Sequence, residues 1–205
     1  MLSRRMWFAL GLGFLLGIRI PAASRDMPMA KPPTLPAVEW NVCPFEGCTY
    51  REWTAAKPVT LYSTWQTSRK QVGSVRRGEK VVGVTGLVVT FRPGRIRLDR
   101  DYPDTNDMRA SPSEPALKRG DVLLTYTYRG EGFSAVWFGG TFYSEFDISF
   151  TKWPDGSGCG GEHCAATYVD LGRKQWWAKV KLRPDRTAWV NMNQAQFNGV
   201  DALGL

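Results

Sequence analysis

The fold is decided by the stretch Trp176-Trp-Ala-Lys-Val-Lys-Leu-Arg-Pro-Asp-Arg-Thr-Ala-Trp-Val190, in which two runs of alternating polarity flank a proline-bearing turn. Successive side chains of a strand point to opposite faces, so one face of this hairpin is apolar and the other mixes tryptophan with lysine. The mixed face holds Trp177, Lys179, Lys181 and Trp189. The sequence therefore predicts a β-hairpin with strands at Trp176–Leu182 and Thr187–Met192.

The length of the turn sets which residues of the two strands face each other. A three-residue loop, from Pro184 to Arg186, aligns Val180 with Val190, so that apolar side chains meet. A two-residue loop would instead pair Val180 with Trp189 and bury that tryptophan. We expect the three-residue loop, which leaves Trp177 and Trp189 beside the lysines.

The rest of the chain from Val38 onward has the same β character. Short apolar, β-branched and aromatic runs are broken by glycine-bearing turns, and no window keeps helical periodicity for ten residues. Further strands are expected at Val59–Trp65, Lys80–Val84, Leu87–Arg92, Val122–Tyr128, Ser134–Phe138, Phe146–Phe150 and Thr167–Leu171. Many short strands with frequent turns predict an all-β fold, either a small barrel or a sandwich.

Two separated segments carry a resemblance to a known family. The first segment consists of Pro58-Val-Thr-Leu-Tyr-Ser-Thr-Trp65 and, after a gap, Gln71-Val-Gly-Ser-Val-Arg-Arg-Gly-Glu-Lys-Val-Val-Gly-Val84. It resembles the opening of a bacterial SH3-like (SH3b) domain. The hairpin at 177–190 resembles its closing half, with Asp185 and Ala188 where the family carries glycine. The whole chain looks like exported bacterial proteins that contain this domain.

The resemblance implies an SH3-like small barrel over residues 38–205. Its halves would lie at about 58–92 and 174–192, with a β insertion at about 93–173 between them. The alternative is two tandem small β domains. In that case Leu117–Leu124 would begin a second copy, because it repeats the hydrophobe, two basic residues, glycine and acid of Val75–Val81.

The N-terminus has the form of a secretory signal peptide over residues 1–24. A basic head with Arg4 and Arg5 precedes the apolar run Trp7–Ile18, and small residues end at Ser24. The run is too short for a bilayer core of ~30 Å, which needs ~20 helical residues. We expect an exported protein, periplasmic or secreted, with a proline-rich linker at 25–37 and no membrane span in the mature chain.

Charge and cysteine content narrow the partners and the chemistry. The formal net charge of +8 falls to about +5 without residues 1–24, and the basic residues are scattered rather than gathered in a stripe, so nucleic acid is not expected as a partner. Cys43 and Cys48, like Cys159 and Cys164, stand five residues apart. In an exported chain this pattern favours disulfides over a four-cysteine zinc site, and we expect no metal. The spacing leaves open whether the bonds form within or between the two segments.

The mixed face of the closing hairpin is the candidate ligand site. If the rings of Trp177 and Trp189 are open, they would stack on sugar faces, while Lys179 and Lys181 would meet the carboxylates of a peptidoglycan fragment. The alternative is that the insertion covers these rings as core. SH3-like bacterial domains resemble modules that recognise cell-wall peptides or glycans. The resemblance therefore implies a non-catalytic binding or scaffolding module of the bacterial cell envelope, without a cofactor, whose partner is a peptidoglycan fragment or an envelope protein.

A cell-wall hydrolase is the remaining alternative. The only histidine, His163, adjoins Cys164 in the sequence, and neighbours on a strand point to opposite faces, so this pair is poorly placed for base activation. Glu145 and Asp147 offer a carboxylate pair for glycan hydrolysis, but a solvated strand face is the simpler explanation of both. We expect binding rather than catalysis.

Overall fold

Strands make up 55% of the residues that the structure describes and curl into two half-barrels. The computed structural model describes residues 26–103, 115–161, 164–183 and 186–203, and these residues contain no α-helix. The all-β prediction is therefore confirmed. Residues 1–24, which the sequence assigns to a signal peptide, lie outside the described residues.

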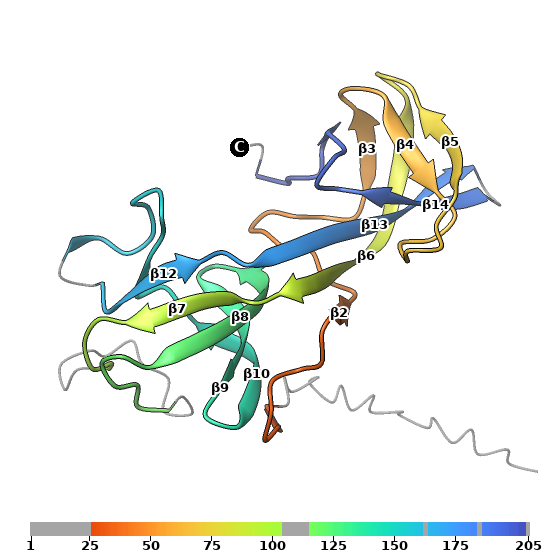
Figure 1. Ribbon diagram of the computed structural model, residues 1–205. Coiled ribbons are helices and arrows are strands. Elements are labelled where there is room, and N and C mark those ends of the chain that lie inside the picture. The colour runs from red at the N-terminus through yellow and green to blue at the C-terminus, as the bar shows by residue number, and fades with distance from the viewer. Residues whose placement is uncertain (1–25, 104–114, 162–163, 184–185, 204–205) are drawn as a thin grey trace, which may run out of the picture.

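A long antiparallel ribbon runs through both half-barrels (Figure 1). One side consists of β6 (Lys80–Arg92) and, after Pro93, β7 (Gly94–Leu98). The other side consists of β12 (Ala166–Asp170) and β13 (Arg173–Arg183). β6 pairs with β13, and β7 pairs with β12, so each half of the ribbon belongs to a different sheet.

The first sheet, which we call the main sheet, joins segments from both ends of the chain. Its order is β15-β3-β6-β13-β14-β4-β5, with β2 also paired to β6. The remaining strands are β2 (Ala37–Trp40), β3 (Glu52–Ala55), β4 (Val59–Tyr62), β5 (Gln71–Val75), β14 (Arg186–Asn191) and β15 (Phe197–Asn198). Trp189 pairs with Tyr62, which places the two segments of the family resemblance in one sheet.

The second sheet, which we call the inserted sheet, is formed mainly by the chain between β6 and β13. Its order is β1-β10-β9-β8-β7-β12-β11. The remaining strands are β1 (Met27–Pro28), β8 (Val122–Gly130), β9 (Phe133–Phe138), β10 (Thr141–Asp147) and β11 (Thr151–Lys152). β1 belongs to the proline-rich segment and pairs with β10, so this segment lies along the inserted sheet.

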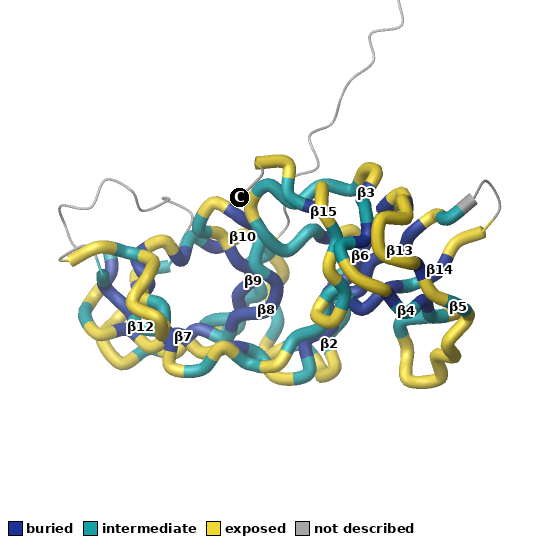
Figure 2. Tube along the Cα trace, turned by 90° about the horizontal axis from the view of Figure 1, so that it is seen from above, coloured by how far each residue is buried: buried dark blue, intermediate teal, exposed yellow. Residues whose placement is uncertain are grey.

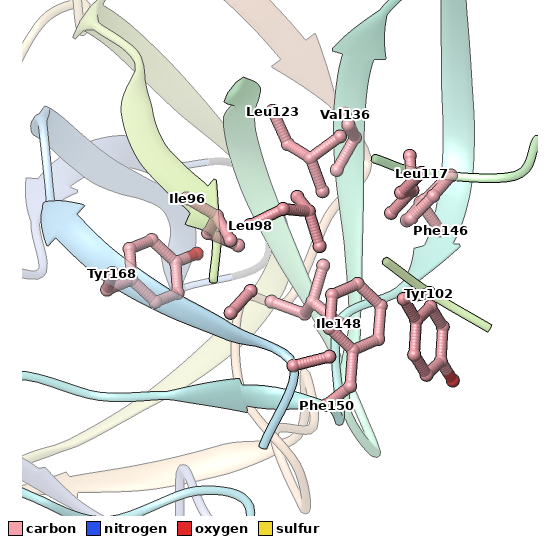
Figure 3. Packing of buried hydrophobic residues seen from close by; sticks show 12 residues of the cluster. Ile96, Leu98, Tyr102, Leu117, Leu123, Val136, Phe146, Ile148, Phe150 and Tyr168 are labelled. Carbon is pink, nitrogen blue, oxygen red and sulfur yellow. The ribbon is translucent and has the colours of Figure 1, made fainter. Parts of the chain in front are cut away.

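Each half-barrel has its own apolar core, and the two groups of buried positions are separate in Figure 2. The core of the main sheet is built around Trp53 and Val180, both fully buried. The core of the inserted sheet is drawn in Figure 3, where Tyr102 stacks on Phe150 at 4.1 Å between ring centroids. Burial of apolar area on this scale is the main stabilising contribution in both halves.

Some local expectations are wrong, for identifiable reasons. The strand expected at Phe146–Phe150 ends at Asp147, because Thr151 donates its backbone N–H to the Ile148 carbonyl in a turn. In the closing hairpin, Val180 pairs with Ala188 rather than with Val190. The expected three-residue loop from Pro184 to Arg186 is also wrong, because Arg186 belongs to β14 and pairs with Arg183. The register shifts by one further residue between Lys181 and Arg183. From Lys181 to Trp177 the pairing therefore differs from the expected one by two residues, and an even difference leaves every side chain on its expected face.

Candidate ligand-binding surface

Trp177 lies at the centre of one face of the main sheet. It is opposite Leu87 of β6, and its ring meets the ring of Tyr62 edge-on at 5.6 Å. Only 1% of Trp177 is exposed. The ring is therefore not open to a ligand, and its cover comes from residues of the main sheet itself and of the turn after β4, rather than from the insertion.

Trp189 remains at the edge of this face and is half-buried. It sits directly opposite Lys179 across the β13–β14 pair, as expected for residues of the same face. Its ring meets the ring of Trp40 edge-on at 6.2 Å, and Trp40 in turn meets Trp65 at 5.7 Å. We call these three residues, Trp40, Trp65 and Trp189, the tryptophan surface.

The tryptophan surface is assembled by pairing between distant segments. β2 pairs with β6 so that Trp40 lies opposite Leu87, on the same face as Trp177. Trp65 lies in the turn between β4 and β5, which two hydrogen bonds close between Ser63 and Lys70, of 2.9 and 3.0 Å. The rings therefore stand on an ordered backbone.

Cations border the aromatic rings. The guanidinium of Arg69 lies 5.2 Å from the ring centre of Trp177 and 5.7 Å from that of Tyr62. Lys179 lies next to Trp189, and Lys181 is exposed further along the same face of β13. An aromatic ring can hold a cation over its face and also pack against apolar C–H groups of a ligand.

Exposure distinguishes this face from an ordinary core. Trp40 is 54% exposed, although large aromatic side chains are highly buried on average. The residues around it, Val38, Tyr62, Trp65, Phe91 and Trp189, are only partly buried. This arrangement presents several apolar rings to solvent with basic groups beside them.

The sequence analysis missed Trp40 and Trp65. The alternation Val38-Glu39-Trp40 is a β signal, but nothing in the sequence shows that this short strand pairs with β6. Trp65 was assigned to a strand, whereas it stands in a turn beyond Tyr62.

The four cysteines form two local disulfides, Cys43–Cys48 and Cys159–Cys164, as expected. Closed disulfides are typical of proteins outside the reducing cytosol. Cys164 is therefore not available as a thiolate nucleophile, and its neighbour His163 lies outside the described residues.

The carboxylates named for glycan hydrolysis sit on the inserted sheet. Glu145 lines a cleft together with Glu46, Glu131 and Arg129. Asp147 accepts a 2.7 Å hydrogen bond from the Ser149 backbone, which caps a turn. These contacts account for Asp147 structurally.

Within residues 26–103, 115–161, 164–183 and 186–203, no group of three or more His, Cys, Asp or Glu side chains is arranged to hold a metal ion. The described part of the chain also has no helix long and apolar enough to cross a membrane. Comparison with protein-family models, curated proteins and solved structures finds no match to this chain.

Proposed function

We propose that this protein is a non-catalytic binding module of the bacterial cell envelope that recognises peptidoglycan through the tryptophan surface. The observation that carries the proposal is the exposure of Trp40, 54%, within a group of three tryptophans that meet edge-on. The SH3-like resemblance of the sequence and the two disulfides support the same class of protein.

The chemistry of the surface suits a carboxylated glycan. Indole faces pack well against the C–H faces of sugar rings, because both are apolar and flat. Lys179 beside Trp189, and Arg69 over the Tyr62 ring, supply positive charge for the lactyl and peptide carboxylates of peptidoglycan. A neutral glycan would use the rings but not the cations.

The test is co-sedimentation with purified peptidoglycan sacculi, with wild type compared with Trp40→Ala plus Trp189→Ala. We expect the double variant to lose at least about tenfold in affinity, as for tryptophan hot spots. Phe133→Ala is the matched control, because Phe133 is also an exposed aromatic, at 38%, but belongs to the inserted sheet. Its binding should equal that of wild type.

Two further binding measurements, with chitin and with added salt, test whether the carboxylates of peptidoglycan are recognised. Chitin, which has a similar glycan without carboxylates, should bind more weakly than sacculi, and salt should weaken only binding to sacculi. Equal binding of wild type and double variant would reject the proposal. Absence of binding in both would favour an envelope protein as the partner, and released muropeptides would favour the hydrolase.

A further inference from the structure

The opposite face of the main sheet contains a second, separate site. A cavity of about 260 Å³ lies where this face meets β8 of the inserted sheet. Val88, Lys174 and Trp176 line it from the main sheet, and Thr127 and Tyr128 line it from β8. Met192 adds to walls that are mostly apolar. Because side chains alternate along β13, Lys174 and Trp176 face away from the tryptophan surface.

The aromatic wall of the cavity is held in place before any ligand arrives. The indole Nε1 of Trp176 donates to the Tyr50 hydroxyl at 3.2 Å, and this hydroxyl donates to the Val42 carbonyl at 2.6 Å. The Trp176 backbone N–H donates to Asn193 Oδ1 at 2.8 Å. Phe45 also meets the Trp176 ring edge-on at 5.8 Å. A preformed wall reduces the entropy that a ligand loses on binding.

The charge at the cavity is unbalanced. Glu39 of β2 is paired with Arg129 of β8 at 2.7 Å, which leaves Lys174 as the excess cation of this group. The backbone of Lys174 pairs with Thr90 of β6, but its side-chain ammonium forms neither a hydrogen bond nor an ion pair within 4 Å among the described residues. Burial lowers the pKa of Lys174 to about 8, although the charge of Glu39 acts in the opposite direction. A half-buried cation without a partner is costly, so an anionic group beside it would be stabilising.

We propose that this cavity binds a small monocarboxylate with a flat apolar body, whose carboxylate pairs with Lys174 and whose body packs on Trp176. A single excess cation matches one carboxylate rather than a phosphate dianion. The apolar walls exclude a sugar, whose hydroxyl groups would lose their hydrogen bonds to water. The cavity volume restricts the ligand to compounds of about the size of benzoate to indoleacetate.

The first test compares benzoate with benzamide, a neutral compound of the same shape, by isothermal titration calorimetry at pH 7 with the full mature protein. We expect benzoate to bind at least about tenfold more tightly, because a charge-assisted contact is present only in benzoate. Equal affinities, or no benzoate binding, would overturn the proposal without any variant being needed.

Lys174→Met keeps the length of the side chain and removes its charge. It should weaken benzoate by at least about tenfold and leave benzamide unchanged. Lys179→Met is the matched control, because Lys179 lies on the same strand and on the opposite face. Unchanged benzoate affinity in Lys174→Met would place any binding elsewhere.

A third readout locates the ligand directly. Benzoate should slow the acetylation of Lys174 by acetic anhydride, measured by mass spectrometry, and leave that of Lys179 unaffected. Equal protection of both lysines would mean that benzoate does not occupy this cavity. Failure of these tests leaves peptidoglycan binding untouched, because the two sites lie on opposite faces of the main sheet.

Discussion

Gly172 lies directly against Gly94 where the ribbon passes from the main sheet to the inserted sheet. A Cβ atom added to Gly172 would stand 2.6 Å from the Gly94 nitrogen, and it would also collide with the Arg92 carbonyl oxygen. Gly172 has a φ of +75°, which a side chain rarely tolerates. A Cβ atom added to Gly94 would in turn stand 3.1 and 3.2 Å from the carbonyl oxygens of Asp170 and Leu171, so the crossing of the ribbon depends on two glycines that are far apart in the sequence.

Gly172→Ala should lower the free energy of unfolding by about 3 kcal/mol, since backbone strain and steric overlap add. Gly139→Ala is the matched control, because Gly139 also has a positive φ, +58°, but has open space around it. The control should cost about 1 kcal/mol. Urea unfolding measures both, and equal losses would contradict the steric argument.

Arg129→Met should destabilise the contact between the two sheets. The change leaves Glu39 buried without its 2.7 Å partner, and burial already raises the pKa of Glu39. Removing one partner of such a pair costs about 3 kcal/mol. Adding Glu39→Gln in the same chain should recover most of the loss, as measured by urea unfolding.

The control for this pair is Lys80→Met, which breaks the exposed ion pair between Lys80 and Glu52. Its urea midpoint should match that of wild type, because exposed pairs contribute little. If Lys80→Met lowered the urea midpoint as much as Arg129→Met, burial would not determine how much each ion pair contributes to stability.

Lys174→Met should stabilise the protein at pH 7 by about 2 kcal/mol, because it removes a desolvated cation. The folded-state pKa of Lys174, about 8, lies below its ordinary value of 10.5. Between these values the unfolded chain holds more protons, so the stability of wild type rises with pH across this window. The difference in free energy of unfolding between Lys174→Met and wild type should therefore shrink from pH 8 to pH 10.5.

Urea unfolding of wild type and Lys174→Met at pH 7 and pH 10 measures this difference. Burial raises the pKa of Tyr126 to about 12, so this group lowers the free energy of unfolding as the pH rises above 10. The loss is the same in both proteins and cancels when their free energies of unfolding are subtracted. Lys179→Met serves as the control on the other face. A difference that stays constant with pH would contradict the burial of a titrating Lys174.

The two disulfides should differ in their contribution to stability. Each closes a short loop and should stabilise by about 2 kcal/mol on the chain-entropy model. The Cys43–Cys48 loop also holds Phe45 against Trp176, and Cys48 bridges to Asp201 near the C-terminus. Replacing Cys43 and Cys48 with serine should therefore lower the melting temperature more than replacing Cys159 and Cys164. Equal losses would indicate that loop closure alone accounts for both.

Alternation along the chain was sufficient to predict the faces of the closing hairpin. Trp177, Lys179 and Trp189 share one face as expected, because the period of a strand is two whatever the partner. The pairing register of β13 with β14 was not predictable, because it depends on an irregularity near Lys181 that no residue pattern in the sequence indicates.

The tryptophan surface was only half predictable for a related reason. The sequence put Trp177, Lys179 and Trp189 on one face but left open whether the rings are covered, and the structure buries Trp177 beside Tyr62. Trp40 reaches this face only because β2 pairs with β6. Pairing between distant strands depends on the whole fold, so local patterns do not reveal it.

Arg92 and Arg173 are partners across the ribbon, so the chain departs from the main sheet and rejoins it at one point. No strand of the main sheet comes from the segment between these two arginines. A brief loop spliced between these two arginines would close β6 and β13 into a simple hairpin. Apart from β1, the second half-barrel is thus one continuous insertion in the first, and a single genetic deletion between these arginines would remove all of its other strands.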